Sequence, residues 1–234
     1  MKENLDLLVS LFYFYFNGRE KMKIIDLTHV INNDITVYPG GPKPQNKIIS
    51  TVKNDGYKET EIHLNSHNGT HMDSPNHVFD NGTSLDKIDV INFIGNAALI
   101  DCSSLGEGDI ITYDFIEKHK DAINESDFII FKTNWSKYWN TDKYLGNYPV
   151  ISDEVVDYIA NSKKKGIGFD TISVDAIDAT VLYKHHKILE NNILIFENLT
   201  NLDLIDKDTF VFCALPLKLE NSDGAPIRAI AMLD

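Results

Sequence analysis

The sequence predicts a single α/β domain built around a mixed β-sheet. Its 234 residues fall within the range of one such domain and suffice to bury a core without disulfides. From Met22 onward we find no linker, low-complexity tract or internal repeat. Short apolar runs typical of buried strands outnumber the segments with helical spacing. These features together favour one domain spanning residues 22–234.

The expected strands are short, and turn residues separate them. They are expected at residues 24–27, 57–67, 96–102, 127–133, 193–199, 209–215 and 228–232. A further short strand is expected to end at Val174 and Asp175. The prolines and glycines of residues 38–42 predict a loop after the first strand.

Three helices are expected, at residues 113–119, from 153 to about 164, and at 181–190. Thr112 and Ser152 precede the first two, where a hydroxyl can cap the helix N-terminus. An acidic first turn suits the positive end of the second helix. Gly166 is expected to stop that helix.

The first 21 residues carry a short apolar run, Leu11–Phe16, which falls well short of the roughly 20 residues that span a bilayer. Glu3 and Asp6 offset Lys2, and no small-residue cleavage site follows, so a signal peptide is disfavoured. We therefore expect residues 1–21 to lie outside the core domain, as an appended helix or through misassignment of the start site.

The net charge of −13 restricts the classes of partner. Nucleic acids and anionic membrane surfaces are disfavoured, because binding to either depends on lysine and arginine. We expect a small-molecule substrate, with a metal ion supplying positive charge at the site. Cys102 and Cys213 lack the spacing of a metal motif or a disulfide framework. They indicate reduced thiols near the core and a cytoplasmic protein.

The most informative stretch reads HNGTHMDSPNH from residue 67 to 77. Its ligand-type side chains all occupy odd positions and would share one side of an extended chain: His67, His71, Asp73 and His77. Fully extended, the stretch would span on the order of 33 Å, too far for one ion to collect every ligand. Gly69 and Pro75 permit the chain to bend. The sequence therefore predicts a curved loop with its ligands pointing inward.

A second group of ligand-type residues follows later in the chain. His185 and His186 lie in an expected helix, and Glu197 lies in the strand after it. A carboxylate on an apolar strand face is costly unless it is paired or binds a metal. That face is expected to hold Ile193, Ile195 and Leu199 as well. A helix–turn–strand unit would bring one of the two histidines beside Glu197; the alternative is a strand-end glutamate that reaches solvent.

The two groups together supply enough ligands for two metal ions, with Asp73 available as a bridge between them. Imidazole and carboxylate ligands without cysteine favour zinc, with manganese and cobalt as alternatives and magnesium and calcium disfavoured.

The stretch from His67 to His77 resembles the HxGTHxDxPxH signature of the cyclase family, which includes the bacterial kynurenine formamidases. Lesser matches follow in order at residues 26–29, 38–40, 132–135, 168–175, 185, 197–199 and 226–228. The resemblance implies a central mixed β-barrel-like sheet flanked by helices, and assembly as a homodimer or homotetramer.

The resemblance also implies a role for each site residue. The implied ligands of two metal ions, with Asp73 bridging, are His67, His71, Asp73, His185 and Glu197. His77 would be the general acid/base. Tyr38 stands where kynurenine formamidases place a substrate-contacting aromatic residue, usually tryptophan. Tyr38, Gly41 and Lys132 depart from the common residues of the family, and these departures concern the substrate pocket rather than the metal site.

The chemistry that this set of residues predicts is amide hydrolysis. A metal can lower the pKa of bound water from 15.7 to about 7, and the hydroxide would attack the carbonyl while the metal stabilises the oxyanion. His77 would protonate the leaving nitrogen. The favoured activity is an arylformamidase that hydrolyses N-formylkynurenine to kynurenine and formate in tryptophan catabolism. The alternatives are a hydrolase that opens an isatin-like cyclic amide or another small acyl substrate, and a non-catalytic metal-dependent binding protein.

Four further residues have weaker signals. Tyr38 and Trp135 are candidates for an aromatic wall, with plain core packing as the alternative. Asp175 is expected to support the site through hydrogen bonds. For His63 a structural or surface role is favoured over a place beside the site.

Overall fold

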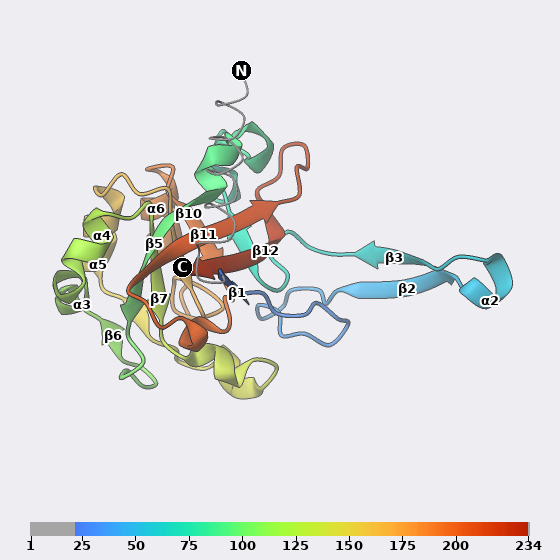
Figure 1. The fold of residues 1–234 in the computed structure, drawn as a ribbon, viewed down its shortest axis with the longest axis horizontal. Helices are drawn as coiled ribbons and strands as arrows, with labels where there is room; N and C mark the ends of the chain where they lie inside the picture. The colour runs from blue at the N-terminus through green and yellow to red at the C-terminus, as the bar shows by residue number, and fades with distance from the viewer. Residues whose placement is uncertain (1–21, 234) are drawn as a thin grey trace, which may run out of the picture.

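A computed structural model describes residues 22–233 of the chain (Figure 1). The expected N-terminal extension, residues 1–21, lies outside the described residues. Within the described range no helix is long and apolar enough to cross a membrane.

The centre of the fold is a closed barrel of strands in the ring order β12-β11-β5-β7-β9-β10-β4, which closes where β4 pairs with β12. The strands are β4 His71–Asp73, β5 Ile94–Asp101, β7 Phe128–Lys132, β9 Gly166–Phe169, β10 Leu194–Glu197, β11 Thr209–Pro216 and β12 Gly224–Leu233. β5, β7, β9 and β10 run parallel, and the other pairs of the ring are antiparallel. The prediction of a single α/β domain with a mixed, barrel-like sheet is confirmed.

A short strand, β1 (Lys23–Asp26), lies outside the ring and pairs with the second half of β12. Its register sets Lys23 opposite Leu233 and Asp26 opposite Ile230. β4 pairs with the first residues of the same side of β12, from Gly224 to Pro226. β12 therefore pairs both with the N-terminal strand β1 and with β4, the strand within residues 67–77, and the pairing with β4 closes the barrel.

Two separate apolar layers stabilise the barrel. Its inside is filled by alternate strand residues, including a triad of rings, Phe128, Phe196 and Phe212, with centroids 5.1–5.8 Å apart. The outer faces of β5, β7, β9 and β10 form the second layer with the helices. Because strand side chains alternate, one set of residues fills the barrel while the next set meets the helices.

The helices cover one side of the barrel (Figure 1). They are α3 Tyr113–Lys118, α4 Lys120–Asn124, α5 Asp153–Ala160 and α6 Tyr183–Leu189. The Ser152 side chain accepts a hydrogen bond from the Val155 amide, as expected of a helix cap. A pair of short strands, β6 (Ile110–Ile111) and β8 (Val150–Ile151), lies beside α3 and α5. The three expected helices are confirmed, although α5 ends earlier than predicted.

One expected strand is misplaced. The strand predicted to end at Val174 and Asp175 is β9, and these two residues lie in the loop that follows it. Gly166 begins β9 rather than stopping α5. The reason is close packing: a Cβ at Gly166 would approach Phe196 to 2.6 Å, and one at Gly168 would approach Ile130 to 2.7 Å. Because two of the four residues of β9 are glycines, the strand lacks the apolar pattern from which strands are predicted.

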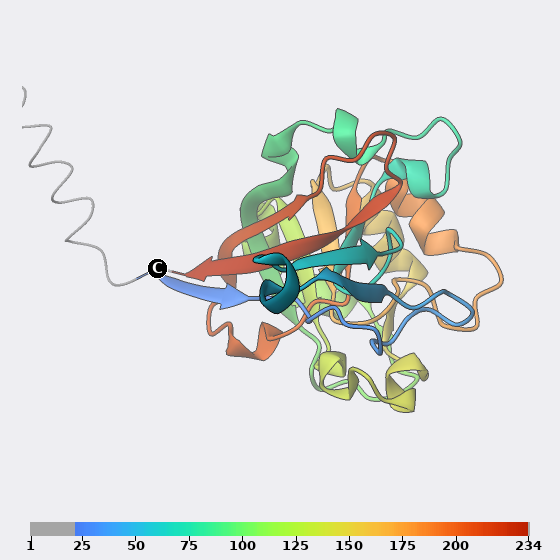
Figure 2. The ribbon, with the colours of Figure 1, turned by 90° about the vertical axis from the view of Figure 1, so that its right-hand side faces the viewer.

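A two-stranded arm, residues 45–64, extends away from the barrel in Figure 1 and points toward the viewer in Figure 2. It comprises β2 (Gln45–Ser50), a single helical turn α2 (Val52–Asp55) and β3 (Glu59–His63). The strand expected over 57–67 is therefore shorter than predicted, and its partner β2 was not predicted. Both strands are largely exposed, so they lack the buried apolar face on which the prediction depends.

Candidate metal centre

The centre of the candidate site lies on the outer face of two neighbouring barrel strands, β4 and β10. Glu197 pairs with His71 and Phe196 pairs with Met72 in an antiparallel register. Met72 and Phe196 fill the barrel, so His71, Asp73 and Glu197 point to the other side. All three side chains are buried. The curved loop expected over 67–77 thus contains a strand at its centre, and a single 3₁₀ turn, Pro75–His77, follows it.

The prediction that Leu199 shares a face with Glu197 is wrong. Ile193 and Ile195 lie on the helix-covered side with Glu197, but Leu199 belongs to the barrel interior. Asn198 adopts a left-handed backbone conformation, with φ of 58°, and thereby breaks the alternation. Glu197 is the last residue of the strand before this change, so its carboxylate stays on the site side.

His71 is held by its own loop. Its Nδ1 lies 2.8 Å from the carbonyl oxygen of Gly69, which fixes Nδ1 as the protonated nitrogen. Gly69 has a φ of 69°, a conformation that favours glycine. The other nitrogen, Nε2, lies 3.4 Å from both Asp73 Oδ1 and Glu197 Oε2. His71 Nε2 therefore faces two carboxylates.

His185 reaches the same carboxylates from α6. Its Nε2 lies 3.3 Å from Glu197 Oε1 and 3.6 Å from Asp73 Oδ2. Its Nδ1 lies 2.7 Å from Asp175 Oδ2, and the same carboxylate accepts the backbone amides of Lys184 and His185. The predicted supporting role of Asp175 is thus confirmed as a set of hydrogen bonds. His186 points elsewhere, with its ring 5.2 Å from that of Phe79.

His67 and His77 lie at the open side of the cluster. The His67 ring stands 4.1 Å from that of His77 and 5.1 Å from that of His71. His67 Nδ1 lies 2.7 Å from Asp73 Oδ1. The His77 ring is 5.6 Å from that of His185. The structure therefore brings together every residue predicted as a metal ligand, with the predicted acid/base beside them.

Asp223 is a site residue that sequence reasoning missed. Its Oδ2 lies 2.8 Å from His67 Nε2 and 3.8 Å from His77 Nδ1. The loop before β12 carries it, and the backbone amide of Ser74 donates to its carbonyl oxygen. The one signal in the sequence is the following Gly224, where a Cβ would lie 2.7 Å from His67 Cε1. A glycine at that position permits the close approach, but many glycines serve other purposes.

The cluster of carboxylates controls the charge of the histidines. Burial alone would lower the pKa of His67, but Asp73 and Asp223 outweigh burial and raise that pKa to about 10. Burial would also lower the pKa of His185. The carboxylates of Asp175, Asp73 and Glu197 outweigh burial and raise that pKa well above its ordinary value. The hydrogen bond from His67 and the nearby His77 lower the pKa of Asp223. Despite burial, the neighbouring histidines lower the pKa of Asp73 and of Glu197.

These side chains surround a cavity of about 260 Å³. The cluster forms one wall with His67, His71, His77, His185 and Glu197. The remaining lining residues are Tyr38, Ile172, Ser173 and Leu182. The Tyr38 hydroxyl lies 3.3 Å from the carbonyl oxygen of Ile177, so the ring is tethered at the rim. Tyr38 thus lines the same cavity as the histidines.

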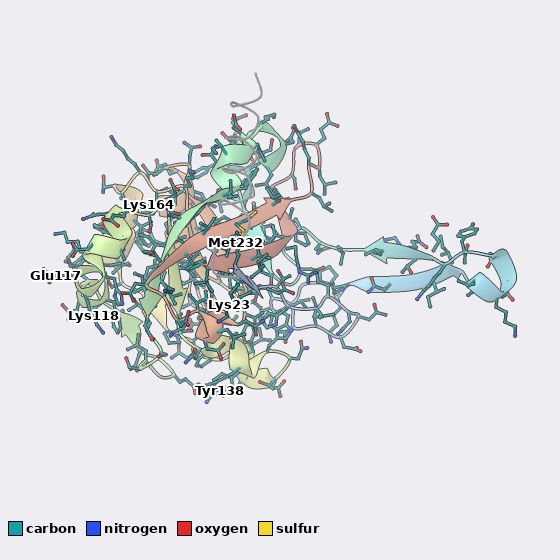
Figure 3. All side chains as sticks on the ribbon, viewed as in Figure 1. Lys23, Glu117, Lys118, Tyr138, Lys164 and Met232 are labelled. Carbon is teal, nitrogen blue, oxygen red and sulfur yellow. The ribbon has the colours of Figure 1, made fainter. Side chains whose placement is uncertain are left out.

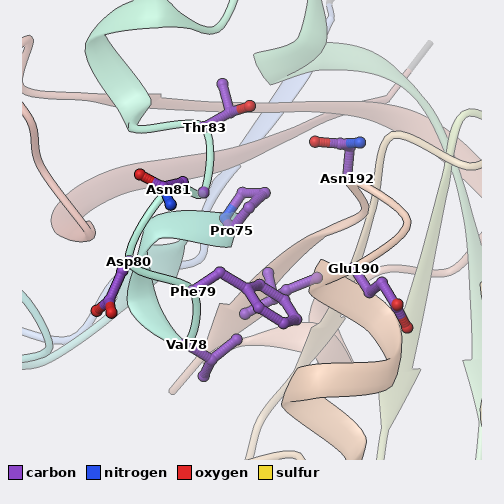
Figure 4. A pocket seen from close by; sticks show the side chains of 10 residues that line it. Pro75, Val78, Phe79, Asp80, Asn81, Thr83, Glu190 and Asn192 are labelled. Atoms are coloured by element: carbon purple, nitrogen blue, oxygen red, sulfur yellow. The ribbon is translucent and has the colours of Figure 1, made fainter.

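A second cavity, of about 640 Å³, lies behind the turn that carries His77 (Figure 4). Its lining includes Pro75, Val78, Phe79, Asp80, Thr83, Glu190 and Asn192. Among the described residues its lining contains no histidine, and none of the cluster described above faces it. The smaller cavity is therefore the one lined by the histidines and Glu197, and it is the candidate site.

Trp135 and His63 lie away from the small cavity. Trp135 donates its indole hydrogen bond to the Tyr144 carbonyl, 3.0 Å away, and belongs to a separate buried aromatic cluster. Of the two alternatives for Trp135, core packing is the observed one. His63 is exposed on the arm beside Glu61, which agrees with the favoured surface role.

The chemistry of this cluster fits a divalent metal ion. Three overlapping groups hold nitrogen and oxygen atoms within 4.8 Å of one another: His67–His71–Asp73, Asp73–His77–His185 and His67–His77–Asp223. Asp73 Oδ2 is buried and has no hydrogen-bond partner, which is costly for a carboxylate oxygen unless a cation occupies the space it faces. The neighbouring histidine and glutamate atoms are of the types that bind zinc or manganese.

The barrel and this cluster define a protein with a candidate metal centre at the edge of an α/β barrel. The sequence model described as putative cyclase matches residues 25–176, and the chain belongs to this cyclase family. An uncharacterised protein of Methanocaldococcus jannaschii is 34% identical over 91% of this chain and 100% of its own length. A kynurenine formamidase of Bacillus cytotoxicus is 28% identical, covering 88% of this chain and 95% of its own.

Solved structures agree with this assignment. The isatin hydrolase A of Labrenzia aggregata, solved with benzyl benzoate, superposes with a TM-score of 0.81 at 26% identity over 97% of this chain and 98% of its own. A protein from Bacillus stearothermophilus described as a predicted metal-dependent hydrolase gives a TM-score of 0.75 at 27% identity, covering 91% and 99%. The chain is therefore a cyclase-family hydrolase related to kynurenine formamidase and isatin hydrolase.

Proposed function

We propose that this chain is a metal-dependent amide hydrolase with an aryl formamide, N-formylkynurenine, as its leading substrate. The observation that carries the proposal is the placement of His77 beside a buried cluster of histidines and carboxylates at the wall of one cavity. The relationship to kynurenine formamidase supports the proposal that the bond hydrolysed is the amide bond of a formamide.

Our assignment of ligands follows the cyclase-family signature, and the distances are compatible with it. We propose that His67, His71 and Asp73 hold one divalent ion, and that His185 and Glu197 hold a second that shares Asp73. Zinc is the leading metal, because imidazole and carboxylate ligands without cysteine suit it. When bound, such ions supply Lewis-acid polarisation of a carbonyl and activation of water.

The role we propose for His77 is proton transfer to the leaving nitrogen. Histidine is the side chain best able to take up and release a proton near neutral pH. His77 is partly exposed at the cavity, and Asp223 Oδ2 lies 3.8 Å from its Nδ1. The negative carboxylate stabilises the imidazolium that forms when His77 takes up a proton, and the proton then passes to the nitrogen as the amide bond breaks.

The rest of the cavity favours a flat, apolar group. Tyr38, Ile172 and Leu182 provide an aromatic ring and two aliphatic side chains against which an aryl ring can pack. We propose that these residues hold the aromatic part of the substrate, while the histidine side receives the amide.

One observation favours a second candidate, a neutral cyclic amide of the isatin type. Among the described residues that line the cavity there is no lysine or arginine. The α-carboxylate of N-formylkynurenine would therefore find no cation in this lining, whereas an uncharged cyclic amide needs none. The likeness to isatin hydrolases supports this candidate as well.

A panel of three substrates tests both candidates: N-formylkynurenine, the uncharged aryl formamide N-formylaniline, and isatin. Turnover is measured together with metal content, before and after chelation and after zinc is restored. Chelator-sensitive turnover of either formamide supports the leading proposal, and turnover of isatin alone supports the second. Metal binding without turnover of any of the three would overturn both and favour a metal-dependent binding protein.

A further inference from the structure

Asn198 directly follows the candidate ligand Glu197, and each of its polar groups has a partner. The residue is 2% exposed. Its backbone amide donates to the Thr171 carbonyl oxygen at 2.9 Å, and its own carbonyl oxygen accepts from the Thr70 hydroxyl at 2.6 Å. Its side chain makes two further hydrogen bonds, one to the turn before His71 and one to a buried tyrosine. None of these groups takes part in the proposed hydrolysis.

The first side-chain contact reaches the carbonyl group that holds His71. Asn198 Nδ2 lies 2.9 Å from the Gly69 carbonyl oxygen, and the same oxygen lies 2.8 Å from His71 Nδ1. A carbonyl oxygen has two lone pairs and can only accept, so both nitrogens donate to it. The two nitrogens lie 3.4 Å apart. This carbonyl group therefore cannot turn away from His71 without breaking two hydrogen bonds.

The second side-chain contact sets which end of the Asn198 amide faces Gly69. The Tyr144 hydroxyl lies 2.8 Å from Asn198 Oδ1 and donates to it. If the amide rotated by half a turn, its oxygen would face the Gly69 carbonyl oxygen, and two acceptors would repel each other. Tyr144 therefore holds the amide with its donor toward Gly69.

Tyr144 is itself held from two sides by the aromatic cluster between β7 and β8. The side chain is fully buried, and its ring meets that of Trp139 edge-on at 5.0 Å. The Tyr144 carbonyl oxygen accepts from the Trp135 indole at 3.0 Å. Figure 3 shows Tyr138 at the outer edge of this segment. The cluster that contains Trp135 thus reaches the candidate metal centre through the Tyr144 hydroxyl.

The turn before His71 needs this support because it contains a glycine. Gly69 has a φ of 69°, and a glycine changes conformation more readily than any other residue. A rotation there would withdraw the carbonyl group from His71 Nδ1 and free the ring to carry its proton on Nε2. Nε2 is the nitrogen that faces Asp73 and Glu197, and a proton on it would prevent it from binding a cation.

We propose that Asn198 and Tyr144 are positioning residues that keep the proton of His71 on Nδ1 and direct its Nε2 at the two carboxylates. Neither residue contacts the cavity, and both act through the Gly69 carbonyl group. This role rests on the proposed function, in which His71 binds a metal ion. The orientation of the ring is nevertheless a property of the metal-free chain, so it can be measured separately from metal binding and turnover.

Side-chain ¹H–¹⁵N spectra of the metal-free full chain report on His71, because a buried and hydrogen-bonded Nδ1–H exchanges slowly with solvent. His71→Gln assigns the signal by removing it. We expect a protected Nδ1–H in the wild type and exchange about tenfold faster in Asn198→Gly, as for the loss of one buried hydrogen bond. Glycine suits the φ of 58° at position 198, so this variant removes the side chain without straining the backbone.

The chain offers a matched control for Asn198→Gly. Asn201 also has a positive φ, of 57°, and its Nδ2 donates to a backbone carbonyl oxygen, that of Asp26, at 2.8 Å. Asn201→Gly therefore removes the same kind of contact from another part of the fold. It should leave the exchange of the His71 Nδ1–H at the wild-type rate. Chemical denaturation checks that both variants fold.

A second pair of variants tests the role of Tyr144 and carries the test if Asn198→Gly does not fold. Tyr144→Phe removes the hydroxyl that donates to Asn198 and should speed the exchange of the His71 Nδ1–H about threefold. Tyr148→Phe is its control, because it also removes a buried hydroxyl, one that donates to the Asp175 carbonyl oxygen at 2.6 Å. That control should leave the exchange rate unchanged.

Zinc affinity, measured by competition with a chromogenic chelator, completes the test. Asn198→Gly is expected to bind zinc about tenfold more weakly than the wild type or Asn201→Gly, because it loosens the support of a ligand histidine. A wild type without zinc binding would overturn the proposed function and leave the exchange result standing. The positioning role is overturned by an unprotected His71 Nδ1–H in the wild type, or by wild-type exchange in both Asn198→Gly and Tyr144→Phe. Equal acceleration in the two controls, or wild-type zinc affinity in Asn198→Gly, overturns it as well.

Discussion

Asp223 Oδ2 lies 2.8 Å from His67 Nε2, although the two residues stand 156 positions apart in the chain. The contact exists because β12 closes the barrel against β4, which brings the loop before β12 onto the turn that carries His67. The Ser66 hydroxyl also donates to the Asp223 carboxylate, at 3.2 Å. The first residue of the signature is therefore oriented from the far end of the chain.

The first prediction concerns this contact. Asp223→Asn is expected to lower metal affinity by about 10–100-fold, because a carboxylate that accepts from a ligand histidine fixes its ring and raises its basicity. Competition with a chromogenic chelator measures the change. Ser66→Ala removes the other hydrogen bond to the same carboxylate and is expected to change the affinity by less than about threefold, which corresponds to a hydrogen bond of about 0.5 kcal/mol. Equal affinities for wild type and Asp223→Asn would contradict the role of Asp223.

The second prediction concerns the glycine after Asp223. In Gly224→Ala the new Cβ would lie 2.7 Å from His67 Cε1 and 2.8 Å from the Met72 carbonyl oxygen. We expect a loss of about 1–3 kcal/mol in the free energy of unfolding, because neither β4 nor the His67 ring can move freely. Bound metal should fall as well.

Chemical denaturation and elemental analysis measure these two effects. Gly106→Ala is the control, since its Cβ would make only an ordinary contact, 3.6 Å from Asp109. Unchanged stability of Gly224→Ala would show that the loop before β12 adjusts, and that Gly224 does not fix the position of His67.

Much of the barrel could be predicted from the sequence, and the reasons for the failures are physical. β5, β7, β10 and β11 are runs of apolar residues, so their burial is visible in the chain itself. β9 contains two glycines that make room for Phe196 and Ile130, and apolar periodicity does not detect a strand of that kind. The strands of the arm were hidden for the opposite reason, because neither of their faces is buried.

The site divides in the same way. The ligand-type residues of 67–77 lie close together in the chain, so spacing alone indicated a cluster. Asp175 and Glu197 were detectable as polar residues beside buried strands. Asp223 was not, because its role depends on the closure of the barrel, which places residues more than 150 positions apart in contact. A lone aspartate in an acidic chain carries no local signal.

The third prediction separates metal binding from catalysis. His77→Gln is expected to keep its metal but to lose turnover by about 10²–10⁴-fold, the usual contribution of a general acid or base. The assay uses whichever substrate of the panel is turned over, with metal content measured on the same sample. His186→Gln is the control, because His186 lies on α6 with its ring against Phe79 and outside the lining of the cavity. Loss of metal from His77→Gln would show that His77 is a ligand instead.

The last prediction is the pH dependence of stability in the metal-free protein. In the folded chain Asp73 and Asp223 raise the pKa of His67 from 6.5 to about 10 against the effect of burial. A pKa raised on folding contributes stability that is fully present below about pH 6.5 and is lost as the pH rises through about 10. We therefore expect the melting temperature of the chelated protein to fall across this window. The carboxylates with lowered pKa values do not contribute there, because they stay ionised in both states.

Thermal melts of chelated wild type and His67→Gln at pH values from 6 to 10 measure the effect. The variant should show a shallower fall than wild type, and a residual fall is expected because His185 also has a raised pKa. The metal-loaded protein should behave oppositely from pH 6 to 8, since a bound cation replaces the proton and its affinity grows as protons leave. Parallel curves for chelated wild type and chelated His67→Gln would show that His67 is not held as an imidazolium by Asp73 and Asp223 when metal is absent.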